Sequence, residues 1–501
     1  MPSHDATTLT RRALLAGAGA SAAALALGPA RANGQPAGAA TTVFTHTTVI
    51  NVDEVRDDVA LAVRGDRIAA IGATDEVLAA HPGAIVYDGR GKALVAGLIN
   101  CHAHLGATLA RGFNEDFGFP NSYRLAVQPA SLVSREEATL MVTVGALECI
   151  RSGTTTVVEN VGNIAPTAGA LARTGLRCVF AESIRDSENV PGPLSPEGLA
   201  TGETPRFSAK LREAGLQRIA DLHAAWHGRA NGRITVFPAA ALAETSSPEL
   251  LQAVAAFAEK HDLGYTIHLS QSRAEVAFMR KHHGVSPVGY LARHGFLGPR
   301  LFAAHCRYVD DADIALLGAS GTIVSHQAGM AANRGVIPPI PALRAAGCPI
   351  ANGTDNNTND MFEVMRIALL TERIRRDDEF PGVRPQPEDV LEDATLGGAR
   401  AVRQPLVGAL EVGRKADLLV VDTQRIHLVP AVRFLSAWIH NGQPADIESV
   451  MIDGRFVMRD RTILTMDEAA IIAEADRVGR RVWSAVQARS PIVIPGRPRR
   501  R

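Results

Sequence analysis

Two histidines one residue apart, His102 and His104, close an apolar run that begins at Leu94. In an extended strand alternate side chains point to the same face, so both imidazoles can reach one metal ion. Imidazole nitrogen is a usual ligand of zinc, iron and similar ions, and a catalytic zinc site takes about three protein ligands and one water. The pair therefore indicates half of a catalytic metal site, although chance alone also produces this spacing.

Three more side chains of this chemical kind end short apolar runs further along the 501-residue chain: His268, His305 and Asp355. Apolar runs alternate here with helical stretches, which is typical of a parallel sheet with crossover helices. Eight such units predict a (β/α)8 TIM barrel of roughly 250 residues, whose chemistry lies at the C-terminal ends of the strands. All five side chains would then converge on one rim. The eight expected strands cover residues 94–104, 154–160, 176–183, 234–240, 264–271, 301–306, 321–327 and 349–355.

The segments on either side of this barrel have a different pattern of apolar and polar residues. Residues 41–92 alternate apolar and polar side chains between turn signals, and a similar pattern returns at 416–422 and 450–457. Such short alternating segments predict β-strands, and two separated sets can pair into one discontinuous domain. We therefore expect a composite β-sandwich domain from 41–92 and 405–465, a catalytic barrel over 93–404, and a C-terminal helix over 466–490.

The first 32 residues have the composition of an export signal. Arg11 and Arg12 precede an alanine-, leucine- and glycine-rich run at 13–29, and Ala-Arg-Ala follows at 30–32. This order is typical of a twin-arginine signal peptide with its cleavage site. The alternatives are the start of an amphipathic helix or a membrane anchor, but the apolar run is short for a membrane span. We expect a periplasmic or secreted protein without membrane contact after export.

The overall charge and the cysteines exclude some classes of partner. Lys plus Arg and Asp plus Glu are equal at 52 each, which argues against nucleic acid or an anionic membrane bound through bulk charge. The five cysteines form no Cys-x-x-Cys pair and are expected as small buried side chains. A small-molecule substrate fits this composition, and a homo-oligomer is left open.

Taken together, these segments resemble the amidohydrolase superfamily, in its branch of deaminases and chlorohydrolases, from about residue 41 to residue 480. The resemblance implies the barrel and the composite β domain that the patterns also predict. It is carried by residues 95–104, 153–156, 267–269, 304–306, 353–355 and 408–418.

The resemblance also implies a metal centre and roles for its residues. His102, His104, His268 and Asp355 would bind one divalent metal ion, while His305 would hydrogen-bond the attacking water or the substrate. Binuclear members of the superfamily bridge two metals with a lysine of the fourth strand, and residues 234–240 contain no lysine. We therefore expect a single ion, with zinc preferred and iron as the alternative.

A zinc-type ion lowers the pKa of its bound water towards ~7, so a metal-bound hydroxide is the expected nucleophile. Asp355 can take the proton of this water and pass it to the leaving group. His305 can hold the water or stabilise the oxyanion that forms on attack. Asp355 and His305 are therefore candidate catalytic residues, together with Gln271.

Gln271 is a departure from the pattern that the resemblance implies. Ring deaminases of this branch usually have a glutamate three residues after the histidine of strand five, and it protonates a ring nitrogen. An amide cannot donate a carboxylic proton, but it can hydrogen-bond a carbonyl or amide group. Residues 324–330 likewise replace the usual His-Asn-Pro of strand seven. The candidate substrate-binding residues are Gln271, His305, His326 and Asn356.

These observations predict a metal-dependent hydrolase of C–N bonds other than peptide bonds, with an amide, urea, carbamate-like or heterocyclic substrate. A heteroaromatic amine deaminase or a chlorohydrolase is the first alternative, because both use the same nucleophile. A small-molecule-binding protein that keeps the barrel without its chemistry is the alternative of another class.

Overall fold

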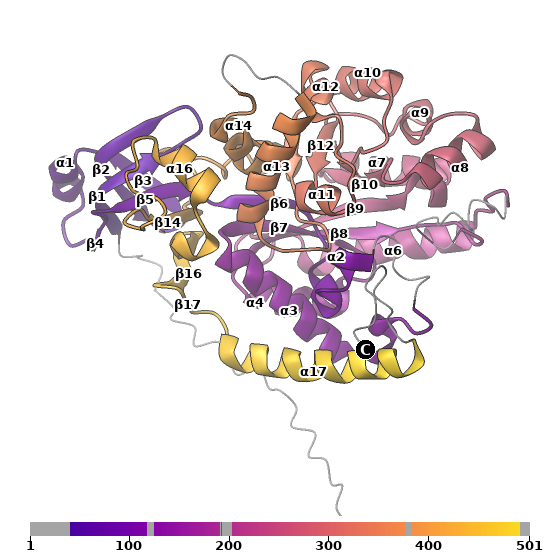
Figure 1. Ribbon diagram of the computed structural model, residues 1–501, viewed down its shortest axis with the longest axis horizontal. Helices are drawn as coiled ribbons and strands as arrows, with labels where there is room; N and C mark the ends of the chain where they lie inside the picture. The colour runs from indigo at the N-terminus through magenta and orange to yellow at the C-terminus, as the bar shows by residue number, and fades with distance from the viewer. Residues whose placement is uncertain (1–40, 118–124, 191, 193–202, 377–382, 491–501) are drawn as a thin grey trace, which may run out of the picture. The chain divides into compact units, whose positions relative to one another are not determined.

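The computed structural model describes residues 41–117, 125–190, 192, 203–376 and 383–490, so the predicted signal at 1–32 lies outside the described residues. Two sheets dominate the described chain, one parallel and one mainly antiparallel (Figure 1). All five cysteines are buried and free. Within the described residues, no helix combines the length and the apolar character needed to span a membrane.

The parallel sheet has eight strands that pair in chain order, as the eight apolar runs predict. Its two edge strands meet through a bridge between Ala103 and Asp355, which closes the sheet into a barrel. The predicted TIM barrel is confirmed. Its strands are β6 (Leu98–Ala103), β7 (Thr154–Val161), β8 (Arg177–Ile184), β9 (Ile234–Leu242), β10 (Tyr265–Leu269), β11 (Leu301–His305), β12 (Ile323–His326) and β13 (Ile350–Asn352).

Helices surround the barrel, and nearly every strand residue is buried, because the strands face packed side chains both inside the barrel and beneath the helices (Figure 1). This explains why the strands appear in the sequence as continuous apolar runs. The helices of this layer are α3 (Arg135–Arg151), α4 (Ala165–Arg173), α6 (Ala209–Trp226), α7 (Pro248–Lys260), α8 (Arg273–His283), α9 (Pro287–Arg293), α10 (Asp311–Ser320), α11 (Ala328–Asn333), α12 (Ile340–Ala345), α13 (Met361–Arg376), α14 (Pro387–Glu392) and α15 (Gly398–Ala401).

Several of these helices begin at a side chain that caps the first turn. The Ser134 hydroxyl accepts a hydrogen bond from the N–H of Glu137, whose carboxylate accepts one from the N–H of Ser134. The Ser247 hydroxyl accepts the N–H of Leu250 at the start of α7, with proline as the next residue, and Asp310 and Asp313 form the reciprocal pair at α10. Such caps satisfy N–H groups that have no partner inside the helix, so they fix where each helix starts.

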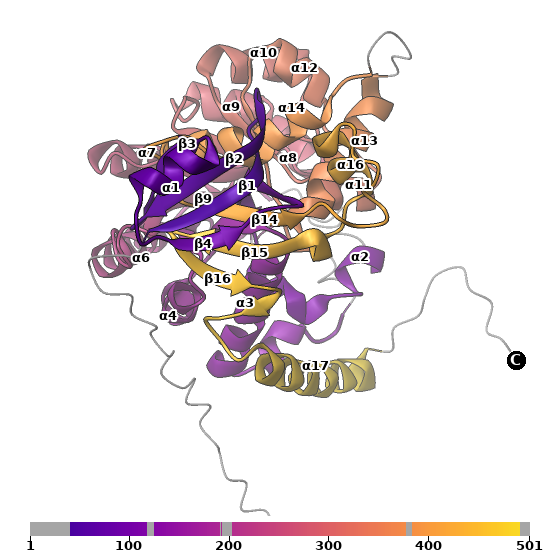
Figure 2. The same ribbon diagram turned by 90° about the vertical axis from the view of Figure 1, so that its left-hand side faces the viewer.

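The second sheet has nine strands from both ends of the described chain. Its central strand β5 pairs in parallel with β1 and antiparallel with β14, so segments more than 300 residues apart lie side by side (Figure 2). The order is β17-β16-β15-β14-β5-β1-β2-β3, with β4 also paired to β1. The strands are β1 (Thr42–Ile50), β2 (Val55–Arg64), β3 (Arg67–Gly72), β4 (Ile85–Asp88), β5 (Lys92–Ala96), β14 (Leu418–Asp422), β15 (Ile447–Ile452), β16 (Arg455–Arg459) and β17 (Thr462–Ile463).

The first apolar run, at 94–104, is not one strand as expected but parts of two. It breaks at Gly97, where β5 of the nine-stranded sheet ends and β6 of the barrel begins. A Cβ atom at Gly97 would lie 2.1 Å from the Oγ1 of Thr155, so only glycine allows the barrel to pack this closely. The N–H of Gly97 donates to Asp417 and that of Leu98 to Gly153, which anchors the junction to both sheets.

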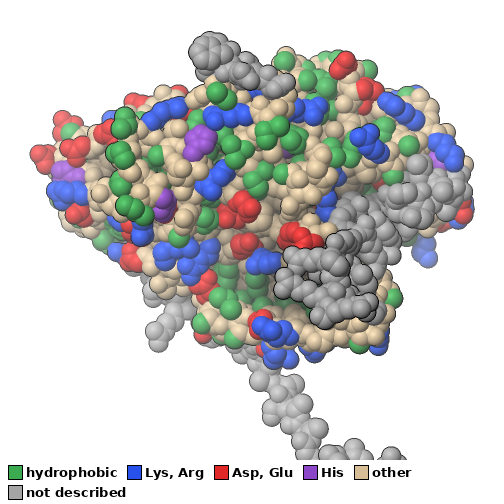
Figure 3. Space-filling view, in the orientation of Figure 1, with side chains coloured by type: hydrophobic (Ala, Val, Ile, Leu, Met, Phe, Trp, Pro, Cys, Tyr) green, Lys and Arg blue, Asp and Glu red, His purple; other side chains and the backbone are tan. Residues whose placement is uncertain are grey.

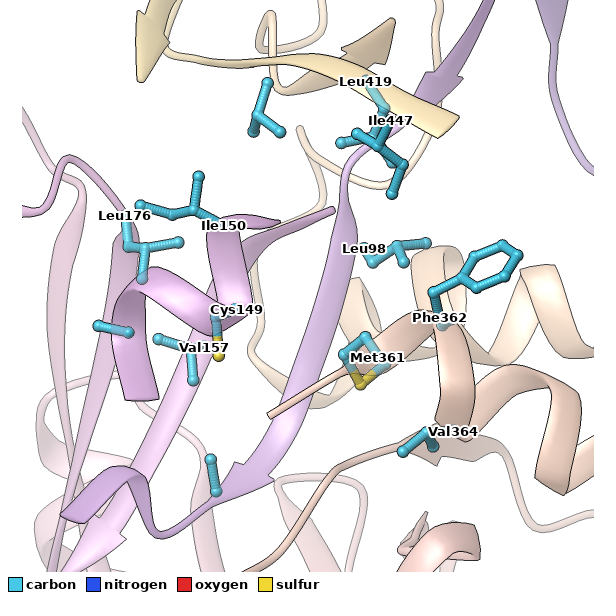
Figure 4. Packing of buried hydrophobic residues seen from close by; sticks show 14 of the residues in the cluster. Leu98, Cys149, Ile150, Val157, Leu176, Met361, Phe362, Val364, Leu419 and Ile447 are labelled. Atoms are coloured by element: carbon cyan, nitrogen blue, oxygen red, sulfur yellow. The ribbon is translucent and has the colours of Figure 1, made fainter. Parts of the chain in front are cut away.

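The two sheets share one hydrophobic cluster, which Figure 4 shows from close by. Leu98 of β6 lies between Leu419 and Ile447 of the nine-stranded sheet and Met361 and Phe362 of α13. All five side chains are almost completely buried. This cluster fixes the start of β6, and therefore the strand that carries His102.

The remaining helices are α1 (Thr74–Ala80), α2 (Asn114–Phe117), α16 (Phe434–Asn441) and α17 (Glu468–Arg489). In α17, Val478, Val482 and Val486 pack against Met141 of α3. The indole N–H of Trp483 donates to the carbonyl of Leu109, in the 3-10 turn η1 (Leu105–Ala110) that follows His104. Acidic and basic side chains are mixed over the face shown in Figure 3.

Candidate active site

The five side chains that end the predicted strands meet at the C-terminal end of the barrel. The Nε2 atoms of His104 and His268 lie 3.3 Å apart, and that of His104 lies 3.6 Å from Oδ1 of Asp355. The ring of His102 has its centre 4.8 Å from the ring centres of both His104 and His268. The Nδ1 of His305 lies 3.7 Å from Oδ2 of Asp355. In two overlapping groups, donor atoms lie within 4.8 Å of one another, close enough to share one ion.

Backbone pairing between β6 and the end of β13 places three of these residues. The N–H of Asp355 donates to the carbonyl of His102 at 2.9 Å, and the N–H of His104 donates to the carbonyl of Asp355 at 3.2 Å. The side chain of Asn100 also ties the two segments together, because its Oδ1 accepts the N–H of Thr354 at 3.1 Å. The contacts that close the barrel therefore also assemble the candidate ligands.

Two of these residues lie at strand ends with positive φ, at 79° for His305 and 64° for Asp355. Residues other than glycine rarely adopt this conformation, and it occurs often at functional sites. It turns the chain sharply where the strand reaches the barrel mouth.

Hydrogen bonds orient the imidazole rings. The Nδ1 of His268 donates to the carbonyl of Ala241 at 2.9 Å, which turns its Nε2 towards the other histidines. The side-chain amide of Asn160 lies 3.4 Å from Nδ1 of His102. The Nε2 of His102 is buried and has no hydrogen-bond partner among the described residues, as expected of a nitrogen that binds an ion.

Burial sets the protonation of the site. It lowers the pKa of His104 and of His268 to about 4, and it lowers the pKa of His102 and of His305 well below the usual value. Burial also raises the pKa of Asp355. Neutral imidazole is the form that binds metal, so the histidines are ready for an ion near pH 7. The residues present therefore fit one divalent ion of the zinc type.

A cavity of about 460 Å³ opens over these residues, which is the size of a small-molecule site. Gln271, His305 and Asn356 of the predicted substrate-binding set line it. His326 does not. It is buried and neither ring nitrogen has a hydrogen-bond partner within the described chain, and burial lowers its pKa to about 3.

Residues at the end of the seventh strand, β12, hold the backbone of His305 in place. The Oε1 of Gln327 accepts the N–H of His305 at 2.8 Å, and its amide Nε2 donates to the Oγ of Ser325 at 2.8 Å. On the other side of the site, the Glu275 carboxylate accepts the N–H of Gln271 at 2.7 Å. Both segments that carry candidate catalytic side chains are therefore held by buried hydrogen bonds.

Sequence reasoning missed several residues of this site. Ala241 contributes only a backbone carbonyl, which has no signal in the sequence. Asn160 closes the second predicted strand, and the rule that chemistry lies at strand ends points to it. Arg185, Arg307 and Arg334 also line the cavity, and an isolated arginine in a sequence is most often on the surface.

Comparison with known proteins agrees with the fold. Residues 93–457 match the amidohydrolase family, and residues 60–84 match the bacterial imidazolonepropionase-like composite domain. The chain is 32% identical over 435 residues to a 5-methylthioadenosine/S-adenosylhomocysteine deaminase of Desulforudis audaxviator, which covers 85% of this chain and 95% of that protein. It is 34% identical to a 5'-deoxyadenosine deaminase of Methanothermobacter thermautotrophicus, over 78% of this chain and 88% of the other.

Solved structures give the same result. An adenosine deaminase from Xanthomonas campestris with bound zinc superposes with a TM-score of 0.79 at 25% identity, over 89% of this chain and 99% of that one. A zinc complex of atrazine chlorohydrolase from Arthrobacter aurescens, at 20% identity, has the same fold with a TM-score of 0.76, over 87% and 100% of the two chains. The chain therefore belongs to the amidohydrolase family and is a metal-dependent hydrolase of carbon–nitrogen bonds.

Proposed function

We propose that the protein hydrolyses an amide, urea or carbamate-like C–N bond of a small molecule. The observation that carries this proposal is that the cavity wall near His268 is formed by an amide side chain, that of Gln271. Asp355 is the only carboxyl group among the described residues that line the cavity. A site with one proton-carrying carboxylate suits a reaction that needs no second acid to protonate an aromatic ring.

The residues divide the reaction between them. A divalent ion held by His102, His104, His268 and Asp355 would supply Lewis-acid chemistry and activate a water. Asp355 takes a proton from the attacking water and delivers it to the leaving nitrogen. A C–O bond forms, the C–N bond breaks, and the products are an acid and an amine or ammonia. His305, beside Asp355, donates a hydrogen bond to the oxygen that gains negative charge.

Gln271 serves to orient the substrate. Its backbone N–H donates to the Glu275 carboxylate, which fixes the position from which the side-chain amide extends along the cavity wall. An amide both donates and accepts hydrogen bonds, which matches the N–H and C=O groups of an amide or urea. This pairing places the carbonyl carbon over the metal ligands.

Deamination of a heteroaromatic amine is the second candidate. It is favoured by the deaminase relatives, whose similarity extends over most of the chain. This reaction would need a proton donor other than Gln271 for the ring nitrogen. Hydrolytic dechlorination belongs with it, because only the leaving group differs.

The experiment is a substrate screen with zinc-loaded protein. Amides, ureas and carbamates are compared with amino- and chloro-heterocycles of similar size, and amine, ammonia and chloride release are measured. The Asp355→Asn variant is the control for contaminating activity. We expect release from the first group, at least tenfold faster than from the second.

Two outcomes contradict the proposal in different ways. Release from amino-heterocycles alone would establish the second candidate. If the wild type binds metal but releases no more product from any compound than Asp355→Asn does, the protein is a binding protein that has kept the barrel.

A further inference from the structure

Three arginines from separate parts of the barrel line the cavity over the candidate ligands. Arg185 follows β8, Arg307 lies two residues beyond His305, and Arg334 follows α11. Asp355 is the one carboxylate on the described part of the same wall. The cavity wall is therefore rich in positive charge although the whole chain has no net charge.

Arg307 is the most informative of the three, because it is only 8% exposed. Its Nη2 donates to the backbone carbonyl of Gln271, and its Nη1 lies 3.5 Å from the sulfur of Met330, a weak acceptor. Among the described residues, its Nε donates no hydrogen bond and its guanidinium forms no ion pair. The ring centre of Tyr308 lies 5.9 Å from Cζ of this guanidinium, and Asp355 and Glu275 act on its charge only at longer range.

A buried guanidinium without a paired carboxylate is costly, because it has lost its water and stays charged. Within a packed core such a residue would be replaced or paired. On a cavity wall, the same side chain has N–H donors left for a ligand. Arginine presents these donors in a planar fork that matches a carboxylate.

The other two arginines add charge around Arg307. Arg334 is half-buried, and both Asp355 and Glu115 act on it electrostatically. Arg185 is exposed at the rim. Apolar side chains of Val161, Leu242 and Met330 complete this part of the wall, so a bound molecule also meets hydrocarbon surface.

We propose that the substrate carries a carboxylate that Arg307 binds inside the cavity, while its scissile C–N bond faces the candidate metal ligands. The proposal rests on the proposed function, since it specifies the substrate of the same site. Arg334 and Arg185 raise the local concentration of the anion and guide it inward. The substrates would therefore be acids such as N-acyl or ureido acids.

The test is a binding measurement that does not depend on turnover. Isothermal titration calorimetry compares 3-phenylpropionate with 4-phenylbutan-2-one, in which an uncharged acetyl group replaces the carboxylate. We expect the acid to bind about tenfold or more tightly, as a charge-assisted hydrogen bond predicts. The preference should persist in protein stripped of metal, because the arginine and not the ion binds the carboxylate.

Variants locate the effect. Arg307→Gln should abolish the preference, and Arg307→Lys, which keeps the charge without the fork, should retain part of it. Arg185→Gln at the exposed rim is the matched control and should lose several-fold less affinity than Arg307→Gln. The wild-type comparison of acid and ketone needs no variant, so it tests the proposal even if Arg307→Gln does not fold.

Equal affinity for acid and ketone would overturn the proposal, and so would a preference that disappears with the metal or survives in Arg307→Gln. Failure of the proposed function is distinguishable from this. A carboxylate preference without hydrolysis of any compound would support the anion site and contradict only the reaction. Hydrolysis of uncharged amides as fast as that of their acid counterparts would contradict only the anion site.

Discussion

A backbone hydrogen bond joins His104 to Asp355, and the candidate ligand atoms of their side chains lie close together. The N–H of His104 donates to the carbonyl of Asp355 at 3.2 Å, and the His104 Nε2 lies 3.6 Å from the Asp355 Oδ1. These residues are 251 positions apart in the sequence, at the first and last strands of the barrel. Closing the barrel therefore brings the two halves of the ligand set into contact.

Replacing His102, His104 or Asp355 with alanine should leave the protein folded but poor in metal. Each change removes one of the four proposed ligands, and the bond to the ion that is lost with it weakens zinc binding. Zinc content per chain is measured after dialysis, together with the melting temperature. His81→Ala, in the nine-stranded sheet domain, is the control. Full zinc content with undiminished turnover in all three variants would contradict the metal centre.

The junction at Gly97 gives a stability prediction. Gly97→Ala would place a Cβ atom 2.1 Å from Oγ1 of the buried Thr155, where neither sheet can move freely. Overpacking of this kind costs about 1–3 kcal/mol of unfolding free energy, and thermal unfolding should show the loss. Gly479→Ala is the control, because no atom lies within 4 Å of its added Cβ. The control should gain ~0.5–1 kcal/mol, as expected for glycine in a helix; an equal gain at Gly97 would refute the packing argument.

The sequence predicts most of this fold because barrel strands are apolar on both faces and carry their chemistry at one end. Each of the runs from 154 onwards overlaps one observed strand of the barrel. The error at 94–104 has a physical reason. One apolar run can pass through two sheets, and the break depends on the contact between Gly97 and Thr155, which only the folded chain contains.

The site was predictable to a similar extent. Histidine and aspartate at strand ends are visible in the sequence, but the Ala241 carbonyl that orients His268 is not. The sequence predicts His326 at the cavity, but it is not among the residues that line it, since neighbouring strand residues face opposite sides and the strand end cannot be located to one residue. Arg307 could not be predicted, because its burial depends on Gln271, which follows β10, and on Met330 of α11.

We propose that residues 1–32 direct export by the twin-arginine route, and Arg11→Lys with Arg12→Lys should stop it. The twin arginines are the recognised part of such signals, so lysines keep the charge but lose recognition. Cell fractionation and immunoblotting should find the double variant in the cytoplasm at full length. Arg31→Lys, between the two alanines of the expected cleavage site, is the charge-matched control. Unchanged periplasmic recovery of the double variant would point to another route.

Glu244 gives a prediction for the pH dependence of stability. Burial, with the nearby Glu275, raises its pKa well above the usual value. As pH rises above about 4.5, the unfolded chain loses this proton first, so stability falls by up to about 1.4 kcal/mol per pH unit until the folded pKa is reached. Glu244→Gln removes this loss.

The melting temperature of Glu244→Gln minus that of wild type should therefore increase as the pH is raised from 5 to 8. The control is Glu249→Gln in the first turn of α7. The N–H groups of that helix end lower the pKa of Glu249, so this carboxyl group is ionised in both the folded and the unfolded chain over most of this range, and the stability of Glu249→Gln relative to wild type should stay nearly constant between pH 5 and pH 8. A difference between Glu244→Gln and wild type that does not depend on pH would show that Glu244 titrates normally.

The substitution Gln271→Glu tests which reaction the site performs. If Gln271 pairs with an amide or urea group, a carboxylate there leaves a substrate N–H or C=O mispaired and adds negative charge near Asp355. The loss should be about 1–3 kcal/mol, or roughly five- to 150-fold in kcat/KM. If the enzyme deaminates an aromatic ring, glutamate instead supplies a ring-protonating acid and should raise turnover. The measurement is kcat/KM of both proteins on the substrate found by the screen, with zinc content checked in each. A clear gain with glutamate would replace the proposed amide or urea hydrolysis with deamination.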